Sequence, residues 1–236
     1  MEIGPILRAM TRNKLGVILI ALQIAFTMTV IINAIFIINE RSRLMARPSG
    51  IDEANTFYLT TVGFGENFNE QVMIEDDMAM IRQLPGVVSA SVTNALPLTN
   101  SGSGTGVRIE NDPDLPSIFT AIYRSDEKIV ESLDLEIIAG ETFSASDMHL
   151  RGRNAETGAS KTIVTEALAG ELFPEVSANE VVGKTIYMPE GTPLQIVGVV
   201  ARLQQPWQQN FEVEQSMIVP ENIIDATLND LRAPFD

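Results

Sequence analysis

The stretch LGVILIALQIAFTMTVIINAIFIIN, residues 15–39, contains no charged side chain. As a helix rising about 1.5 Å per residue it would be about 37 Å long, which is enough to cross a hydrocarbon core of about 30 Å. A secretory signal has a shorter apolar stretch and a small-x-small cleavage site, whereas this stretch runs directly into Glu40, Arg41 and Arg43. The sequence therefore predicts an uncleaved transmembrane helix over residues 15–39.

Small and polar side chains form a stripe along this predicted helix. On a helical wheel, Gly16, Gln23, Thr27 and Ala34 fall within an arc of about 40°. Lipid tails offer Gln23 no hydrogen-bond partner, and small residues let two helix backbones approach closely. We therefore predict that these four residues pack against other transmembrane helices. The alternative is a lone anchor that tolerates a few polar residues.

Residues 1–14 combine apolar side chains at helical spacing with the basic residues Arg8, Arg12 and Lys14. This pattern predicts a short amphipathic helix on the cytoplasmic membrane surface. Equally many basic residues follow the apolar stretch, so a count of positive charges does not orient the anchor. Because long domains translocate largely regardless of charge, we expect the short N-terminal piece inside and the large domain outside.

The rest of the chain is strongly acidic. The formal net charge is −15, and residues 1–39 carry +2, which leaves −17 for residues 40–236. Nucleic acid is not an expected partner, because phosphate neutralisation needs clustered basic residues. The acidity would keep a domain solvated beside an anionic membrane. The chain has no cysteine, which excludes disulfides and thiol nucleophiles.

Residues 40–236 are predicted to form a mixed α+β domain. Pro48, Ser49 and Gly50 mark the exit from the anchor. A first β-α-β pattern comprises a strand over 56–62, a helix over 70–84 and a strand over 87–93. A second comprises a strand over 162–164, a helix over 166–173, and strands over 185–188 and 195–200. Two such units favour an α+β architecture of two lobes.

The predicted elements between and after these units are shorter. They are a loop over 96–106, strands over 107–110 and 118–123, a helix over 126–133, a strand over 135–139, a strand over 216–219 and a helix over 221–236.

No residue pattern indicates catalysis. The glycine-rich loop 101–106 lacks the lysine that a phosphate-binding loop requires, because Val107 follows Gly106. His149 is the only histidine, and no nucleophile or orienting carboxylate accompanies it in a recognisable pattern. Glu75, Asp76 and Asp77 lack the spacing of a calcium loop, and a solvated helix face is expected there. Trp207 is either a buried packing residue or an exposed contact residue, and the sequence leaves both readings open.

Three groups of short stretches carry a family resemblance. The first is LPGVVSAS at 84–91 with NALPLT at 94–99, and the second is LDLEIIAGETF at 133–143. The third is IVTEALAGELFP at 163–174, followed by VGKTI at 182–186 and IVGVV at 196–200. In their order and spacing they resemble the extracytoplasmic core domain of MacB/FtsX-like ABC transporter permeases.

This resemblance implies an inner-membrane protein with a cytoplasmic segment over 1–14, a transmembrane helix over 15–39 and an extracytoplasmic core domain over 40–236. Family members have three further membrane helices after this domain, so we expect the chain to be truncated at its C-terminus. Some members carry a fused nucleotide-binding domain before the first helix. Met1 leaves no room for one here, and a separate ATPase is therefore expected.

The leading functional hypothesis is a non-enzymatic permease subunit that couples ATP hydrolysis by a separate ABC ATPase to work on an extracytoplasmic substrate. No cofactor is expected in this chain, because the partner ATPase would bind ATP. The resemblance also implies a homodimer or paired permeases and an extracytoplasmic adaptor protein. The alternative is a single-pass anchored binding or sensor domain without transport. An extracytoplasmic enzyme that uses His149 is a third hypothesis.

Overall fold

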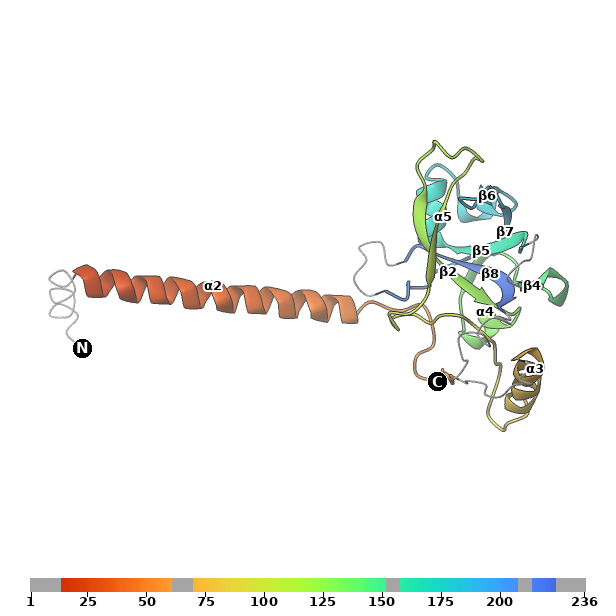
Figure 1. The fold of residues 1–236 in the computed structure, drawn as a ribbon, viewed down its shortest axis with the longest axis horizontal. Coiled ribbons are helices and arrows are strands. Elements are labelled where there is room, and N and C mark those ends of the chain that lie inside the picture. The colour runs from red at the N-terminus through yellow and green to blue at the C-terminus, as the bar shows by residue number, and fades with distance from the viewer. Residues whose placement is uncertain (1–13, 61–69, 152–157, 208–213, 224–236) are drawn as a thin grey trace, which may run out of the picture. The chain divides into compact units, whose positions relative to one another are not determined.

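The computed structural model describes residues 14–60, 70–151, 158–207 and 214–223. The chain separates into two compact units, residues 1–47 and residues 48–236. The first unit contains helix α2 (Lys14–Met45), which is red to orange in Figure 1. Of the predicted amphipathic segment, only Lys14 is described, and it begins α2.

Helix α2 contains the predicted span in full and extends beyond it. Over Lys14–Leu44 its length and composition suffice to cross a membrane, with a mean hydropathy of 2.5 in the apolar window. The hydroxyl of Thr27 donates to the carbonyl of Gln23 at 2.8 Å, so this polar group is satisfied within the helix. The helix ends at Met45, close to Pro48, because proline removes a backbone donor and restricts the residue before it to extended conformations.

The second unit is built on one mixed sheet. Its strands are β1 (Ser103–Val107), β2 (Ile118–Ser125), β3 (Ile137–Gly140), β4 (His149–Arg151), β5 (Lys161–Thr165), β6 (Thr185–Tyr187), β7 (Pro193–Val200) and β8 (Ser216–Ile223). Their order is β1-β2-β8-β5-β7-β3, with β4 also beside β8 and β6 also beside β7. The pairs β2–β8, β4–β8 and β5–β7 are parallel, and the other pairs are antiparallel.

The sheet curls until two of its distant strands meet. Arg108, directly after β1, exchanges two backbone hydrogen bonds with Tyr187 at the end of β6, at 3.0 and 2.8 Å. Since β1 and β6 lie at opposite ends of the row β1-β2-β8-β5-β7-β6, this bridge closes the row on itself. The curl encloses one face of the sheet.

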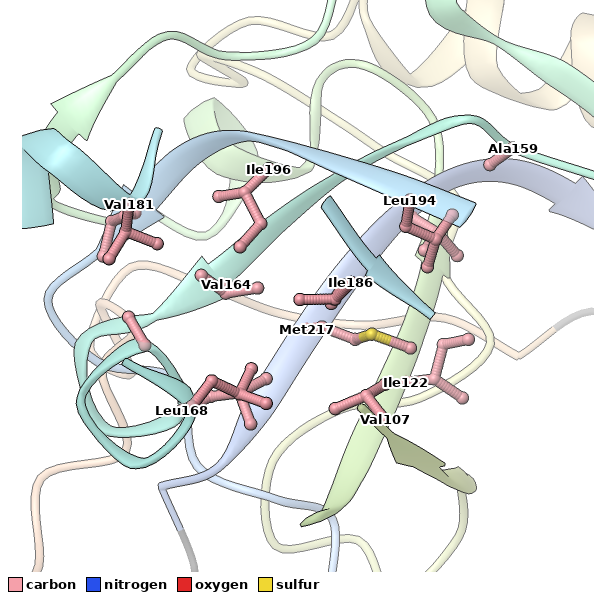
Figure 2. Close-up of a cluster of buried hydrophobic side chains, with 14 of the residues drawn as sticks. Val107, Ile122, Ala159, Val164, Leu168, Val181, Ile186, Leu194, Ile196 and Met217 are labelled. Atoms are coloured by element: carbon pink, nitrogen blue, oxygen red, sulfur yellow. The ribbon is translucent and has the colours of Figure 1, made fainter. Parts of the chain in front are cut away.

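An inner cluster of apolar side chains fills the curl (Figure 2). Ile122, Val164 and Met217 contribute to it from β2, β5 and β8, and all three are almost fully buried. Helix α5 (Glu166–Leu172) adds Leu168, and the short helix α6 (Ala178–Val181) adds Val181. Their burial supplies the main stabilisation of this face.

An outer cluster covers the opposite face of the same strands. The residues next in sequence to inner residues, such as Tyr123, Ile163 and Ile218, belong to it, because successive side chains of a strand point to opposite faces. Helix α4 (Ile129–Ser132) and the residues after it pack on this face. Ile51 and Trp207 pack against the cluster from its margin.

Short local motifs fix the helix starts. The Thr165 hydroxyl accepts a hydrogen bond from the amide of Leu168 at 3.3 Å and caps α5. Ser144 and Asp147 form a reciprocal capping box around the single 3-10 turn η1 (Ala145–Asp147). Ser177 and Glu180 do the same at α6, and these hydrogen bonds to Ser177 lower the pKa of Glu180.

The structure confirms the α+β class and most of the elements predicted after residue 100. The helices predicted over 70–84 and 166–173 are α3 (Glu70–Ile81) and α5. The strands predicted over 118–123, 162–164 and 195–200 are β2, β5 and β7. Residues 48–236 form one compact unit, which includes α3.

Several predicted elements are wrong. Residues 103–106 are strand β1 and not loop, because they pair with β2 along their length. Strand β8 passes through Pro220 to Ile223, where a helix from 221 was predicted, and residues 224–236 lie outside the described residues. The helix predicted over 126–133 is shortened to α4. Residues 56–60 and 87–92 are assigned to no strand, because a strand forms only where a neighbouring segment pairs with it.

Candidate functional site

The chain enters the second unit through a hydrogen-bonded joint. The side-chain amide of Gln204 donates to the carbonyl of Pro48 at 2.8 Å, and its backbone amide donates to the carbonyl of Ser49 at 2.9 Å. Both Ser49 and Gln204 are buried. We call residues 48–52 together with residues 202–205 the exit joint. It holds the first residues after the anchor against the loop that follows β7.

Gly50 lets the two segments of the exit joint approach each other closely. It has a φ of +91°, which side-chain-bearing residues rarely adopt. A Cβ atom at this position would lie 2.3 Å from the carbonyl oxygen of Arg202. Glycine is therefore required here both for the backbone conformation and for space.

Three further contacts fix the segment after Gly50. Ile51 packs against the outer cluster. The backbone amide of Asp52 donates to the carbonyl of Leu133 at 3.2 Å. The Ser49 hydroxyl and the Glu53 carboxylate are hydrogen-bonded at 2.5 Å. The chain is thus held at several points within five residues of its entry.

Gln204 also connects the joint to the centre of the sheet. The hydroxyl of Tyr123 on β2 donates to the carbonyl of Gln204 at 2.5 Å, and Tyr123 is fully buried. Burial raises the pKa of Tyr123, so its hydroxyl stays protonated and keeps donating. Gln204 therefore links Pro48 to β2 through its own side chain and that of Tyr123.

The neighbouring Gln205 connects the joint to β8. Its side-chain amide donates to the carbonyl of Gln215 at 2.8 Å, immediately before that strand begins. The same carbonyl accepts the backbone amide of Ala121 at 3.0 Å and the hydroxyl of Thr120 at 3.1 Å, both on β2. The two central parallel strands are thus tied to each other and to the joint.

A buried ion pair joins the far ends of the same two strands. Arg124 of β2 and Glu221 of β8 are 3.0 Å apart, with side chains only 10% and 9% exposed. The other oxygen of Glu221 accepts the backbone amide of Ala159 at 3.0 Å. Removing either partner would take away the counterion of a buried charge, so the pair ties these strand ends together.

The structure decides between the two readings of Trp207. Its ring packs against Phe119 with centroids 5.9 Å apart, and it contacts the outer cluster. It is partly buried beside the end of the exit joint. Trp207 is therefore a packing residue that braces the loop carrying Gln204 and Gln205.

The residues expected to pack in the membrane all lie on α2. Gly16, Gln23, Thr27 and Ala34 share one face of this helix by their spacing. Their packing against a second helix stays a prediction.

His149 lies in β4, and this strand pairs it with Glu221 of β8 in the sheet. Among the described residues, no group of three or more histidine and acidic side chains is arranged to hold a metal ion.

Sequence reasoning identified Pro48 to Gly50 as the exit but missed the joint. Pro48 and Gln204 are 156 residues apart in the sequence, and no local sequence pattern predicts their contact. The only signal was a glutamine-rich stretch beside a tryptophan, a composition that does not specify a buried role. The positive φ of Gly50 could have been suspected from the Pro-Ser-Gly order, which is typical of turns.

The family can now be assigned. The sequence profile of the MacB-like periplasmic core domain matches residues 16–234, almost the whole chain. The chain belongs to this family. The resemblance seen in three groups of stretches is thereby confirmed, and with α2 it indicates a membrane protein whose MacB-like core domain is extracytoplasmic. None of the curated proteins matches the chain.

Three solved structures of bacterial proteins are among those similar to this MacB-like chain. The extracellular domain of the noncanonic ABC-type transporter YknZ from Gram-positive bacteria is 18% identical, with a TM-score of 0.39, 62% of this chain and 61% of that chain covered. The periplasmic region of MacB from Actinobacillus actinomycetemcomitans is 15% identical, with a TM-score of 0.41 and 68% and 59% covered. A domain of a Porphyromonas gingivalis protein described as a permease is 19% identical, with a TM-score of 0.38 and 60% and 49% covered.

The MacB-like chain thus spans about three fifths of the first two of these structures and half of the third. Because these TM-scores are low, the family assignment rests on the sequence profile and not on these structures.

Several residues of the stretches that resemble the family hold specific positions in the fold. The side-chain oxygen of Asn94 accepts a hydrogen bond from the backbone amide of Arg124 at 2.7 Å and so binds the edge of β2. Gly140 ends β3 with a φ of +75°, and a Cβ there would lie 2.1 Å from the carbonyl oxygen of Val197. Thr165 caps α5 and also donates to the carbonyl of Glu214 at 2.7 Å. These residues fix the strand edge, the sheet turn and the helix start.

Proposed function

We propose that this chain is the anchored, extracytoplasmic part of an ABC transporter permease in which movement of the membrane helix is passed to the core domain through the exit joint. The observation that carries the proposal is Gln204, which binds Pro48 and Ser49 on one side and Tyr123 on the other. The family assignment and the apolar helix α2 support it.

In this proposal the N-terminus is cytoplasmic and residues 1–14 lie near a separate ABC ATPase that binds and hydrolyses ATP. The chain itself is non-enzymatic and holds no cofactor. Two copies, or this chain and a second permease, pair through the face of α2 that carries Gln23. The domain then performs mechanical work on an extracytoplasmic substrate or adaptor.

Photocrosslinking in native membranes tests the ATPase partner. A photoreactive residue in place of Arg8 is expected to give an adduct with an ATP-binding protein. The matched control is the same residue in place of Glu190, which is exposed in the extracytoplasmic domain and should give no such adduct. Intact expression without an ATPase adduct from position 8 would contradict coupling to ATP hydrolysis and favour an anchored binding or sensor domain.

Cysteine labelling tests the orientation independently. The chain has no native cysteine, so Thr11→Cys and Glu190→Cys each introduce a single thiol. A membrane-impermeant maleimide should label position 190 in spheroplasts and position 11 only after the membrane is permeabilised. Labelling of position 11 in intact spheroplasts would overturn the proposed orientation.

A further inference from the structure

An extended segment before Asn94 continues the sheet at the edge of β2. Thr93 forms an antiparallel bridge with Ser125, in which the amide of Asn94 donates to the carbonyl of Arg124 at 3.1 Å and the amide of Asp126 to the carbonyl of Val92 at 3.3 Å. Strand β1 pairs only with the first part of β2, up to Ile122, and β8 occupies the other edge. The segment therefore takes the place of β1 beside the last residues of β2.

One edge of this segment is held. The carbonyl of Ala90 accepts a hydrogen bond from the Arg82 guanidinium at 2.8 Å. The amide of Val92 donates to the carboxylate of Asp126 at 3.3 Å, and the same carboxylate lies 3.2 Å from Arg82. The serine hydroxyls at 89 and 132 are 3.0 Å apart. These contacts hold residues 89–93 beside the end of β2 and the start of α4, and the bridge at Thr93 runs antiparallel to β2.

The opposite edge is unpaired within the described residues. Within the part of the chain that the structure describes, the backbone amides and carbonyls of Ser89, Ser91 and Thr93 make no hydrogen bond. In a strand, the backbone groups of alternate residues point to opposite edges, so these three residues share the edge that faces away from β2. An unpaired strand edge of this kind is a template for another strand.

The free edge borders an open hollow of about 1090 Å³. Ser89, Ser91 and Thr93 line it together with residues 55–60 and one side of α3. Phe57, Tyr58 and Leu59 are each 66% exposed, and no residue of α3 with described burial is buried. Apolar side chains are therefore available on the walls of the hollow but are not covered by the described part of the chain.

The charge of the lining is negative. The acidic residues are Asp52, Asp77, Glu131, Asp134 and Glu221, and the only basic residue is Arg124. Arg124 is already paired with Glu221, and Glu131 is paired with Lys128 at 3.2 Å. The carboxylates of Asp52, Asp77 and Asp134 have no ion-pair partner among the described residues. A cationic occupant is favoured over an anionic one.

We propose that this hollow binds an extended, lysine- or arginine-containing segment of a partner protein, which adds a strand to the free edge at Ser89, Ser91 and Thr93. Main-chain hydrogen bonds supply affinity in such strand addition, and alternate side chains supply specificity. A lipid surface would leave the free backbone groups without partners. The site requires only the second unit, so it does not depend on ATP coupling.

Peptide binding to the full chain in detergent tests the proposal. The probe is a fluorescent ten-residue peptide that alternates valine with lysine or threonine, followed by anisotropy. We expect saturable binding that weakens about tenfold or more when glutamate replaces lysine, and that is lost when N-methyl groups block one edge of the peptide. Equal binding of all three peptides would overturn the proposal.

Variants of the free edge provide a matched comparison. Ser91→Pro removes the central backbone donor, whereas Ser91→Thr keeps it and favours an extended conformation. We expect Ser91→Pro to weaken binding about fivefold for one lost hydrogen bond, and Ser91→Thr to bind like the wild type. Equal binding by both variants would contradict strand addition. The N-methylated peptide tests the same bonds on the wild-type chain if Ser91→Pro does not fold.

Hydrogen exchange distinguishes an open edge from one filled by the protein itself. The amides of Ser89, Ser91 and Thr93 should exchange rapidly without peptide and become protected on binding. Protection before any peptide is added would show that another part of the chain occupies the edge, and the proposal would fail.

Discussion

Gln204 uses each of its hydrogen-bonding groups except its side-chain oxygen to connect separate parts of the core domain. Its two amides bind Pro48 and Ser49, and its carbonyl binds Tyr123. A buried amide side chain of this kind is stabilising only while its partners stay in place, because unpaired buried polar groups are costly. At this scale, Gln204 links the two segments of the exit joint to each other and to Tyr123 of β2.

Replacing Gln204 by alanine should weaken the joint measurably. Gln204→Ala removes the donor to Pro48 and leaves a buried carbonyl unpaired, so we expect a loss of about 2 kcal/mol in the free energy of unfolding. Urea denaturation measures it. The control is Gln195→Ala on β7, where the side chain is exposed and the change should be within about 0.5 kcal/mol. Equal effects of both substitutions would contradict the role of Gln204.

Asp147 should make stability depend on pH in the acid range. The hydrogen bonds from Lys161, at 2.6 Å, and from Ser144 lower the pKa of Asp147 to about 2. The unfolded carboxyl has a pKa of about 3.9, so its contribution is fully present above that value and is lost as the pH falls through about 2. We expect Asp147→Asn to destabilise the domain at pH 7 and to differ little from wild type near pH 2. A difference independent of pH would rule out this linkage.

At the scale of elements, the central feature is the pair of parallel strands β2 and β8. They are linked at one end through Gln215 and the exit joint, and at the other end by Arg124 and Glu221. The curl of the sheet places the inner cluster on one side of them and the outer cluster on the other. A force applied at Pro48 would therefore act on the most deeply buried part of the sheet.

The ion pair between these strands should show strong coupling. Arg124→Leu and Glu221→Leu each leave one buried charge, and we expect each to cost about 3 kcal/mol in the free energy of unfolding. The double variant should cost clearly less than the sum, because it removes both charges. A double-mutant cycle by chemical denaturation measures the coupling, and additive effects would refute it.

Gly50 should tolerate alanine less well than another glycine with the same backbone conformation. Gly50→Ala introduces both strain and a clash with Arg202, whereas Gly183 has a φ of +90° with nothing near its Cβ position. We expect Gly183→Ala to cost about 1 kcal/mol and Gly50→Ala about 1–3 kcal/mol more. Thermal unfolding of the two variants measures the difference. Equal costs would mean that the joint can open around a methyl group.

Elements with strong local patterns were predictable, and elements that depend on distant partners were not. The apolar stretch at 15–39 and the helix over 166–173 follow from periodicity and capping alone. Strand β1 was missed because its residues, Ser-Gly-Thr-Gly-Val, have low strand propensity, and pairing with β2 forms it. Residues 87–93 have a strand pattern, but among the described residues only Thr93 pairs with a strand. The exit joint could not be foreseen, since it joins Pro48 to Gln204.

At the scale of the whole molecule, the apolar helix α2 is followed in the chain by the acidic core domain. The first unit ends at residue 47, and the exit joint begins at the next residue. The family places such a core domain in the periplasm. The hydrogen bonds of the exit joint therefore lie directly on the covalent route from α2 into this domain.

The polar face of α2 should govern association in the membrane. Gln23→Leu removes a side chain that needs a hydrogen-bond partner in lipid, so we predict weaker self-association or weaker pairing with a second permease in detergent. Size-exclusion chromatography with light scattering measures it. The control is Ile24→Leu, an apolar exchange at the next position. Unchanged assembly of Gln23→Leu would remove the helix-packing argument.

The most direct test of the account measures movement of the domain relative to the lipid surface. A donor fluorophore at Glu190→Cys and acceptor-labelled lipids report this distance by energy transfer in membranes that contain the partner ATPase. The account predicts an ATP-dependent change in transfer that is retained in Gln195→Ala and reduced in Gln204→Ala. No change with ATP, or the same change in Gln204→Ala as in wild type, would contradict transmission through the exit joint.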